Sequence, residues 1–466
     1  MKKETGLQQL VYDYFETRIL FGFYRYGDKI PSIQQIGSMF RLGRTTVRAA
    51  LSLLEKEGYI VTEERKTAVV VFQADRDSFE ENAAKYFIPR KEGMEDFEKA
   101  GLLLFVPLWE EGLRRWDQKK WELFRKETDF SLPDRVLLPV KLYIMALSTL
   151  DNTLILNLYW EAIRYVRFPY LVSKRGKEIN REQLKNITRE EMIALLKQEF
   201  DASYGYLEKE VFEFVETAKH KYGLENVEPI PFRWSVYRQR PQRRYTLASL
   251  IIREIMAGRY PLGSYLPSLV QMKEQFGVSL TTVRRTLSLL EELGITKSYQ
   301  GKGTMVCMEP ADMDFSKDGI RNGFILYMES LQLLSLTIYG ISLCTLQSAP
   351  KEKRVDLKEK LRRLRKDKKS CNCFELYLMF ITEECPLAMV RECYGKLREL
   401  LAWGYPFTVL RLDLEKLDKG YSGTLRRMEE HLEKDDLTAF SKDWKELMES
   451  EERANRELMA EIFRNH

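Results

Sequence analysis

Apolar residues at the start of the chain recur every three or four positions, which is the spacing of an amphipathic helix. This pattern predicts a first helix over residues 7–19. A second helix is predicted to begin after Ser32, whose hydroxyl can cap its first turn. A third helix is predicted over residues 44–57, because Gly58 follows as a residue suited to end a helix.

Two short β-rich stretches follow the third helix, at residues 59–62 and 68–72, and a polar tip joins them. Three helices and a hairpin form a winged helix-turn-helix domain, in which the third helix enters the major groove of DNA. Burial of its Val and Leu stripe leaves the leading end of this helix exposed. Arg can pair there with guanine, and Thr can bind a phosphate or touch a thymine methyl group.

The same pattern recurs 236 positions further along the chain. Residues 31–58 align without gaps on residues 267–294, and 14 of these 28 positions are identical. Upstream glycines recur at the same offset, and the downstream segments echo each other more faintly, as in Leu142–Met145 and Leu376–Met379. The chain is therefore predicted to be a tandem duplication of one unit, and each of the two copies has a short head and a longer tail.

The expected domains are a first winged helix-turn-helix over 1–74, a helical domain over 75–232, a second winged helix-turn-helix over 233–308, and a second helical domain over 309–466. The fold class is mainly α, because the tails contain long amphipathic stretches and few alternating strand patterns. These stretches cover residues 180–218, 356–369 and 423–463. The most apolar segment, 324–346, is interrupted by polar residues and is predicted to be a buried bundle helix rather than a membrane span.

The residues predicted to bind DNA lie at the start of the second helix, the front of the third helix and the wing tip of each head. In the first head they are Ser32, Gln34, Arg44, Thr45, Thr46, Arg48 and Lys66. In the second head they are Ser268, Thr281, Thr282, Arg284, Arg285, Gln300 and Lys302.

Composition adds limits to this interpretation. With 44% hydrophobic and 31% charged residues the chain resembles a soluble globular protein, and its net charge of +5 does not by itself imply nucleic acid. The first residues do not form a secretory signal, so a cytoplasmic location and reduced cysteines are expected. Cys371 and Cys373 are separated by one residue, which is too close for an ordinary zinc motif.

The heads resemble the GntR family of bacterial regulators. The second head carries that family's Leu266-Pro267-Ser268 step, its Thr281-Thr282-Val283-Arg284 stretch and the wing glycines Gly301 and Gly303. The resemblance covers both heads, about a third of the chain, and implies winged helices that bind DNA.

The heads depart from the family pattern in different places. The arginine usually found two residues after the Ser of Pro-Ser is replaced by Gln34 and Val270. The arginine before Thr-Thr is kept as Arg44 but is Leu280 in the second head. The first head replaces the wing glycines with Arg65 and Thr67. Each head is therefore expected to bind more weakly than an intact family head or to read a different half-site, and one of them could have lost DNA binding.

The tails weakly resemble the helical effector domains of the family's FadR/FCD branch, many of which hold a metal with one Asp and three His. The expected histidine positions are Lys141 and Glu375 here, and the chain has three histidines in total, so no metal site and no cofactor are expected. Aromatic residues of the first tail, such as Tyr143, Tyr159 and Tyr165, could line an effector pocket, but core packing explains them equally well.

These observations lead to one main hypothesis: a sequence-specific regulator that binds double-stranded DNA as an intramolecular pseudo-dimer on an imperfect palindrome. The tails would pair with each other, with further homo-oligomerisation left open, and a small-molecule effector could act through a helical domain. No membrane partner is expected. The alternative is a protein-interaction scaffold whose winged helices have partly or wholly lost DNA binding. An enzyme is not expected, because no catalytic grouping or phosphate-binding loop can be assembled from the sequence.

Overall fold

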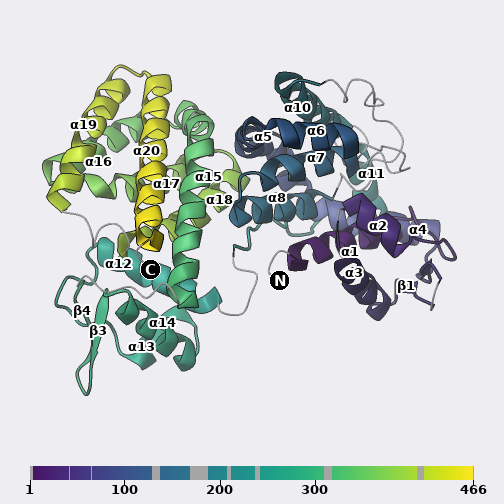
Figure 1. The fold of residues 1–466 in the computed structure, drawn as a ribbon, viewed down its shortest axis with the longest axis horizontal. Helices are drawn as coiled ribbons and strands as arrows, with labels where there is room; N and C mark the ends of the chain where they lie inside the picture. The colour runs from purple at the N-terminus through teal and green to yellow at the C-terminus, as the bar shows by residue number, and fades with distance from the viewer. Residues whose placement is uncertain are drawn as a thin grey trace. The chain divides into compact units, whose positions relative to one another are not determined.

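The structure of the protein is a computed structural model. It describes residues 4–40, 42–63, 66–127, 137–167, 187–206, 211–236, 242–308, 317–406 and 414–464. The chain divides into two compact units, Met1–Arg233 and Trp234–His466. Each unit has a head of three helices and a two-stranded hairpin, followed by a helical tail (Figure 1).

The first head has the elements that the sequence predicts. They are α1 (Glu4–Leu20), α2 (Ile33–Phe40), α3 (Arg44–Lys56), β1 (Ile60–Val61) and β2 (Val69–Val70). The strands are antiparallel, with Ile60 opposite Val70. Val11, Phe15 and Val47 are fully buried where α1 packs against α3, so the apolar stripe forms the core of the head.

The second head repeats this arrangement. Its elements are α12 (Gln242–Met256), α13 (Leu269–Phe276), α14 (Leu280–Glu292), β3 (Thr296–Tyr299) and β4 (Gly303–Val306). In both heads a glycine before the second helix donates its backbone N–H to the last wing strand: Gly27 to Val70 O at 2.9 Å, and Gly263 to Val306 O at 2.8 Å. Their φ angles are +84° and +80°, a left-handed conformation that favours glycine. The recurrence of these glycines therefore has a backbone cause.

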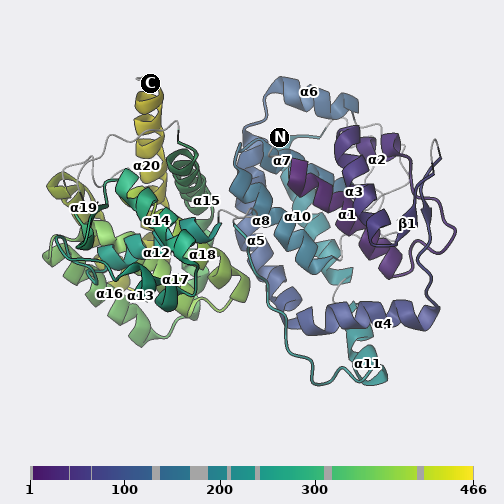
Figure 2. The same ribbon diagram turned by 90° about the horizontal axis from the view of Figure 1, so that it is seen from below.

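The elements of the first tail are all helices over its described residues. Its elements are α4 (Arg76–Phe87), η1 (Ile88–Arg90), α5 (Lys91–Arg114), α6 (Gln118–Glu127), α7 (Leu137–Ser148), α8 (Thr153–Val166), α10 (Arg189–Tyr206) and α11 (Glu213–Lys221). Helix α11 lies beside α4, where Lys221 Nζ pairs with Glu80 Oε2 at 2.7 Å (Figure 2).

The second tail is a helical bundle built around one long pair. Its elements are α15 (Asp318–Ser348), α16 (Lys351–Lys366), η4 (Ser370–Asn372), α17 (Cys373–Glu384), α18 (Ala388–Leu401), α19 (Leu414–Glu433) and α20 (Leu437–Arg464). Helices α15 and α20 lie side by side (Figure 1). The segment Gly319–Ser348 is long and apolar enough to cross a membrane, but 67% of its most apolar window is buried in the protein. This agrees with the prediction of a bundle helix.

The duplication extends into the tails. Helices α8 and α18 have 14 residues each, begin 235 positions apart and bury a tyrosine at the same place, Tyr159 and Tyr394. A second matched tyrosine stacks on a tryptophan in each tail. The ring centroids are 4.1 Å apart for Tyr143 and Trp109, and 4.3 Å apart for Tyr377 and Trp444. The tryptophan belongs to α5 in the first tail and to α20 in the second. Both tails therefore keep the stacked pair, but they take the tryptophan from different helices.

One of the long amphipathic stretches contains a described break between two helices. Residues 423–463 form the end of α19 and most of α20, because Asp435 adopts a left-handed φ of 55° and Asp436 Oδ1 then accepts from Ala439 N at 2.9 Å. Of the stretch 180–218, the structure describes α10 and the larger part of α11, while residues 180–186 and 207–210 lie outside the described residues. Periodicity alone does not reveal such breaks, because both sides of each break share it.

Candidate nucleic-acid interface

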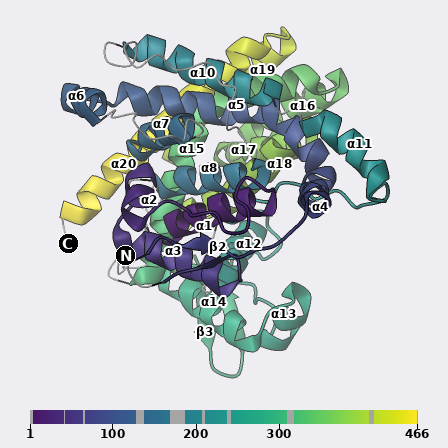
Figure 3. The ribbon, with the colours of Figure 1, turned by 90° about the vertical axis from the view of Figure 1, so that its right-hand side faces the viewer.

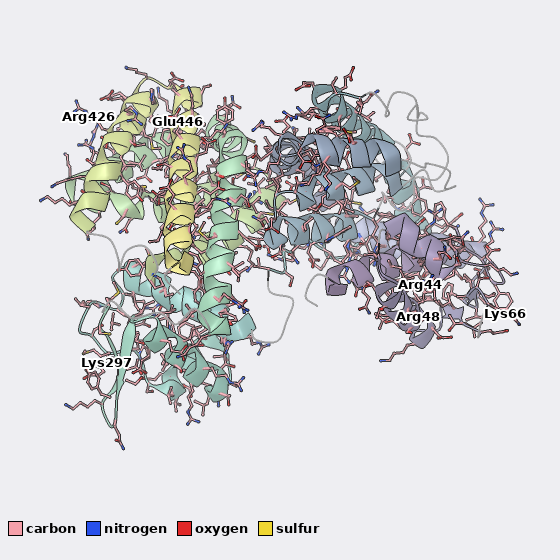
Figure 4. The ribbon with its side chains drawn as sticks, viewed as in Figure 1. Arg44, Arg48, Lys66, Lys297, Arg426 and Glu446 are labelled. Carbon is pink, nitrogen blue, oxygen red and sulfur yellow. The ribbon has the colours of Figure 1, made fainter. Side chains whose placement is uncertain are left out.

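The third helix of each head exposes the same short stripe. On α3 it carries Thr45, Arg48 and Ser52, and on α14 it carries Thr281, Arg284 and Ser288, at matched positions. The opposite side of each helix holds the buried Val and Leu residues of the core. Because residues three and four apart share a helix face, each stripe forms a continuous polar edge. Figure 4 labels Arg44 and Arg48 on the third helix of the first head.

Most of the predicted DNA-binding residues lie on the surface of the heads. Those that are exposed are Gln34, Arg44, Thr45, Arg48, Lys66, Ser268, Thr281, Arg284, Arg285, Gln300 and Lys302. Ser32 and Thr282 are partly exposed.

The prediction that Thr46 lies at the exposed end of the helix is wrong. Its side chain is 5% exposed, because it lies one turn before Ala50 on the buried side of α3. In the second head the matching Thr282 is partly exposed, and its hydroxyl lies 2.9 Å from Ser279 Oγ. The second of the two threonines therefore supports the helix start, and the first faces outward.

The serines of the Pro-Ser steps form capping boxes, as the sequence predicts for Ser32. Ser32 Oγ accepts from Gln35 N at 3.3 Å, and Gln35 Oε1 accepts from Ser32 N at 2.8 Å. Ser268 and Gln271 repeat both distances at the start of α13. Each capping box thereby satisfies two backbone N–H groups and fixes the start of the second helix, which precedes the third, DNA-facing helix of the head. The serine hydroxyls can still donate to a phosphate.

A repeated glutamate ties the wing to the recognition helix. Glu55 Oε1 accepts from the backbone N–H of Thr62 at 2.7 Å, and Glu291 Oε1 accepts from that of Ser298 at 3.2 Å. The hydrogen bonds from Thr62 hold the pKa of Glu55 below its usual range. The Leu-Glu step of each head therefore has a structural role in fixing the angle between helix and wing.

The wing tips differ in charge. In the first head Lys66 forms an ion pair with Glu63 on the same tip. In the second head Lys302 lies at the matching position, Tyr299 replaces the glutamate, and Lys302 has no ion pair with any described residue. The glycines on either side, Gly301 and Gly303, have φ angles of +74° and +107° and allow a tight turn (Figure 3). The second tip therefore presents an uncompensated cation.

Replacing Lys302 by alanine is expected to weaken duplex binding more than the same change at Lys66. The Lys302 charge can release a counterion from a phosphate, whereas Glu63 already neutralises Lys66. The slope of log affinity against log salt is expected to fall by about one for Lys302→Ala. Fluorescence anisotropy over a salt series measures this slope, with Lys360→Ala on α16 as a control. Equal effects at the two wing tips would contradict the assignment.

Two further features of the interface were not among the predicted residues. Ser52 and Ser288 lie one turn beyond the matched arginines, and their identity in the repeat is the signal that could have found them. Lys297 lies exposed on β3, where Figure 4 shows it on the wing of the second head. The first head has Val61 at this position, so the repeat gives no signal for Lys297.

Each head docks on its tail through its first helix, but with different chemistry. In the first unit Asp13 Oδ2 pairs with Arg164 Nε at 2.9 Å, and Glu16 Oε2 pairs with Arg167 Nη2 at 3.0 Å. In the second unit the positions of Asp13 and Glu16 are held by Ser249 and Ile252, which are buried. Ser249 donates a hydrogen bond to the backbone carbonyl of Glu399. In the first joint the head supplies carboxylates to arginines of the tail, whereas in the second the head supplies Arg253, whose Nη2 lies 3.5 Å from Glu375 Oε1 of the tail.

The described residues contain no group of three His, Cys, Asp or Glu side chains that could hold a metal ion. His431 Nε2 lies 3.4 Å from Asp443 Oδ2, and His220 Nδ1 lies 3.1 Å from Glu225 Oε1.

Comparison with known proteins supports the assignment of both heads as winged helix-turn-helix domains. The model of the bacterial regulatory proteins of the gntR family matches residues 7–70 and again residues 244–306. An HTH-type transcriptional repressor of Salmonella typhimurium is 35% identical over 66 residues, which are 14% of this chain and 28% of that protein. The HTH-type transcriptional regulator YhcF of Bacillus subtilis is 35% identical over 75 residues, 15% of this chain and 62% of that protein. The chain thus spans less than two thirds of these relatives.

Solved structures match over about half the chain. A GntR protein of Streptococcus agalactiae is 18% identical, with 46% of this chain and 99% of that chain covered and a TM-score of 0.20. Lar of Listeria monocytogenes is 14% identical, with 48% and 99% covered and a TM-score of 0.24. The resemblance of the tails to the FadR/FCD branch stays a prediction. Both heads, over residues 7–70 and 244–306, thus match the gntR family of bacterial regulatory proteins, and they share one winged helix-turn-helix geometry.

Proposed function

We propose that this chain is a transcriptional regulator that binds double-stranded DNA with both heads, residues 1–74 and 233–308. The observation that carries the proposal is the matched exposed stripe of α3 and α14, with Arg48 and Arg284 at one position. Stripes of this kind lie in the major groove in winged helix-turn-helix proteins. In such a complex the wing-tip lysines would contact the phosphate backbone.

The two heads form an intramolecular pseudo-dimer, supported by the tails over residues 75–232 and 309–466. Binding of one head raises the effective concentration of the other, because both belong to one chain. The heads carry different contact sets: Arg44 stands where the second head has Leu280, and Arg285 stands where the first has Ala49. The target is therefore an imperfect palindrome or a pair of unlike half-sites about 34 Å apart.

Selection from random duplexes, followed by measurement of the mass of the complex, tests this proposal. The expected result is two unlike half-sites bound by one chain. A strictly symmetric site that needs two chains would contradict the pseudo-dimer. Little duplex binding at any salt concentration would contradict DNA binding itself and favour the scaffold alternative.

A further inference from the structure

A cavity of about 450 Å³ lies inside the second unit, where the first helix of the head meets the tail. The head contributes Arg253 and Met256 from α12, and the tail contributes residues from α15, α17, α18, α19 and α20. Apolar and aromatic side chains form part of the lining, Leu331, Phe374 and Tyr405 among them. A volume of this size suits a small organic molecule.

One end of the cavity carries a net positive charge. Arg398 donates to Glu375 Oε1 from Nε at 2.8 Å and from Nη2 at 2.6 Å, while Arg253 Nη2 reaches the same oxygen at 3.5 Å. Two guanidinium groups thus share one carboxylate. The Nε of Arg253 is buried and has no hydrogen-bond partner among the described residues. An anion placed here would gain a charge-assisted hydrogen bond that the protein leaves open.

Another part of the lining offers hydrogen-bonding groups without a full set of partners. Asn455 is 3% exposed; its Nδ2 donates to Glu451 O, but its Oδ1 has no donor among the described residues. Tyr421 donates to Glu451 Oε1 at 2.6 Å. Burial raises the pKa of Glu451, which favours the neutral carboxylic acid. A buried amide oxygen without a donor costs free energy, and a ligand hydroxyl would satisfy it.

The first unit lacks these polar groups at the matching positions. Arg253 corresponds to Thr17 and Arg398 to Ile163, both buried. Lys141 occupies the position of Glu375. The two guanidinium groups that share a carboxylate are therefore specific to the second unit, and the first unit provides an internal comparison.

We propose that this cavity binds a small organic acid with an aromatic or apolar body and a hydroxyl group, and that the bound acid controls the second head. The carboxylate contacts Arg253 and Arg398, and the hydroxyl contacts Asn455. Because Arg253 belongs to α12, the ligand bridges head and tail. Helix α12 also packs on α14, where Thr286 Oγ1 donates to Arg244 O at 3.3 Å. The control of DNA affinity rests on the proposed function, whereas the binding of the acid does not.

Titration calorimetry on the full chain without DNA tests the site. The probes are 4-hydroxyphenylacetate, 3-(4-hydroxyphenyl)propionate and 4-(4-hydroxyphenyl)butyrate, each compared with its neutral alcohol. At least one acid is expected to bind one per chain, and at least tenfold more tightly than its alcohol. Arg398→Gln and Asn455→Leu should each weaken binding at least tenfold, while Arg362→Gln, outside the cavity, should not. Absence of binding for all three acids, or equal binding of acid and alcohol, would overturn the proposal.

A second measurement concerns control of the head. The acid that binds is expected to change duplex affinity when the first head is disabled by Arg44→Ala and Arg48→Ala. By reciprocity, the duplex should change the affinity for the acid by the same factor. If the acid binds but does not change duplex affinity, the proposed control of the head is wrong, whereas the proposed binding site stands. Failure of the chain to bind duplex, with acid binding intact, would instead count against the proposed function. Circular dichroism of each variant checks that it is folded.

Discussion

Replacing Arg284 and Arg285 together by alanine is expected to lower duplex affinity by about 10²- to 10⁴-fold, because the chain loses the gain from linking two heads. Both side chains are exposed at the front of α14, and neither forms an ion pair with a described residue. Their charges are therefore available to bases and phosphates. Competition binding with a selected duplex at fixed salt measures the loss.

The matched change in the first head, Arg44→Ala with Arg48→Ala, is expected to cost less. Lys66, the described cation of the first wing tip, is already neutralised by Glu63, whereas Lys302 of the second tip has no ion pair with a described residue. Changing both heads should abolish specific binding. If either double substitution left affinity unchanged, that head would not contact DNA and the pseudo-dimer would be excluded.

Replacing Trp444 by alanine is expected to destabilise the second unit by about 3–5 kcal/mol, which is typical for removing a buried tryptophan. Trp444 is 1% exposed and stacks on Tyr377 with an interplanar angle of 9°. It also meets Phe374 and Phe440 edge to ring, with centroids 6.0 and 6.5 Å away. The cavity left by alanine would lie between α17 and α20. Denaturant unfolding followed by circular dichroism measures the loss.

Trp444→Phe provides the matched control. The indole Nε1 of Trp444 is buried without a hydrogen-bond partner among the described residues, so phenylalanine removes an unsatisfied donor while keeping an aromatic ring against Tyr377. The expected loss is below about 1.5 kcal/mol. The unfolding of the first unit should not change with either variant. Equal losses for alanine and phenylalanine would show that ring stacking is not the source of stability.

The heads could be predicted from the sequence almost completely, because their signals are local. Helical spacing, a capping serine and glycines with positive φ each act within a few residues. The prediction for Thr46 is wrong because the sequence shows that the residue lies near the start of α3 but not which side of the helix it occupies. The structure places Thr46 on the same side as Ala50.

The tails were harder to predict, because their chemistry depends on contacts between distant residues. The pairing of Leu142–Met145 with Leu376–Met379 marks the duplicated tyrosines, but nothing local tells that Trp109 covers one and Trp444 the other. Arg253, Glu375 and Arg398 are separated by up to 145 positions and meet only in the folded unit. In the sequence, each of these residues looks like an ordinary charged residue on a solvent-exposed helix face.

The unlike joints between head and tail also bear on how the chain avoids misassembly. Two similar heads on one chain can exchange places during folding, a hazard of repeated domains. A first head docked on the second tail would set the buried Asp13 against Glu399 instead of Arg164. A second head docked on the first tail would leave Arg167 facing Ile252 without its carboxylate. Both exchanges would bury an unpaired charge, so the native pairing of each head with its own tail is expected to be favoured over the exchanged one.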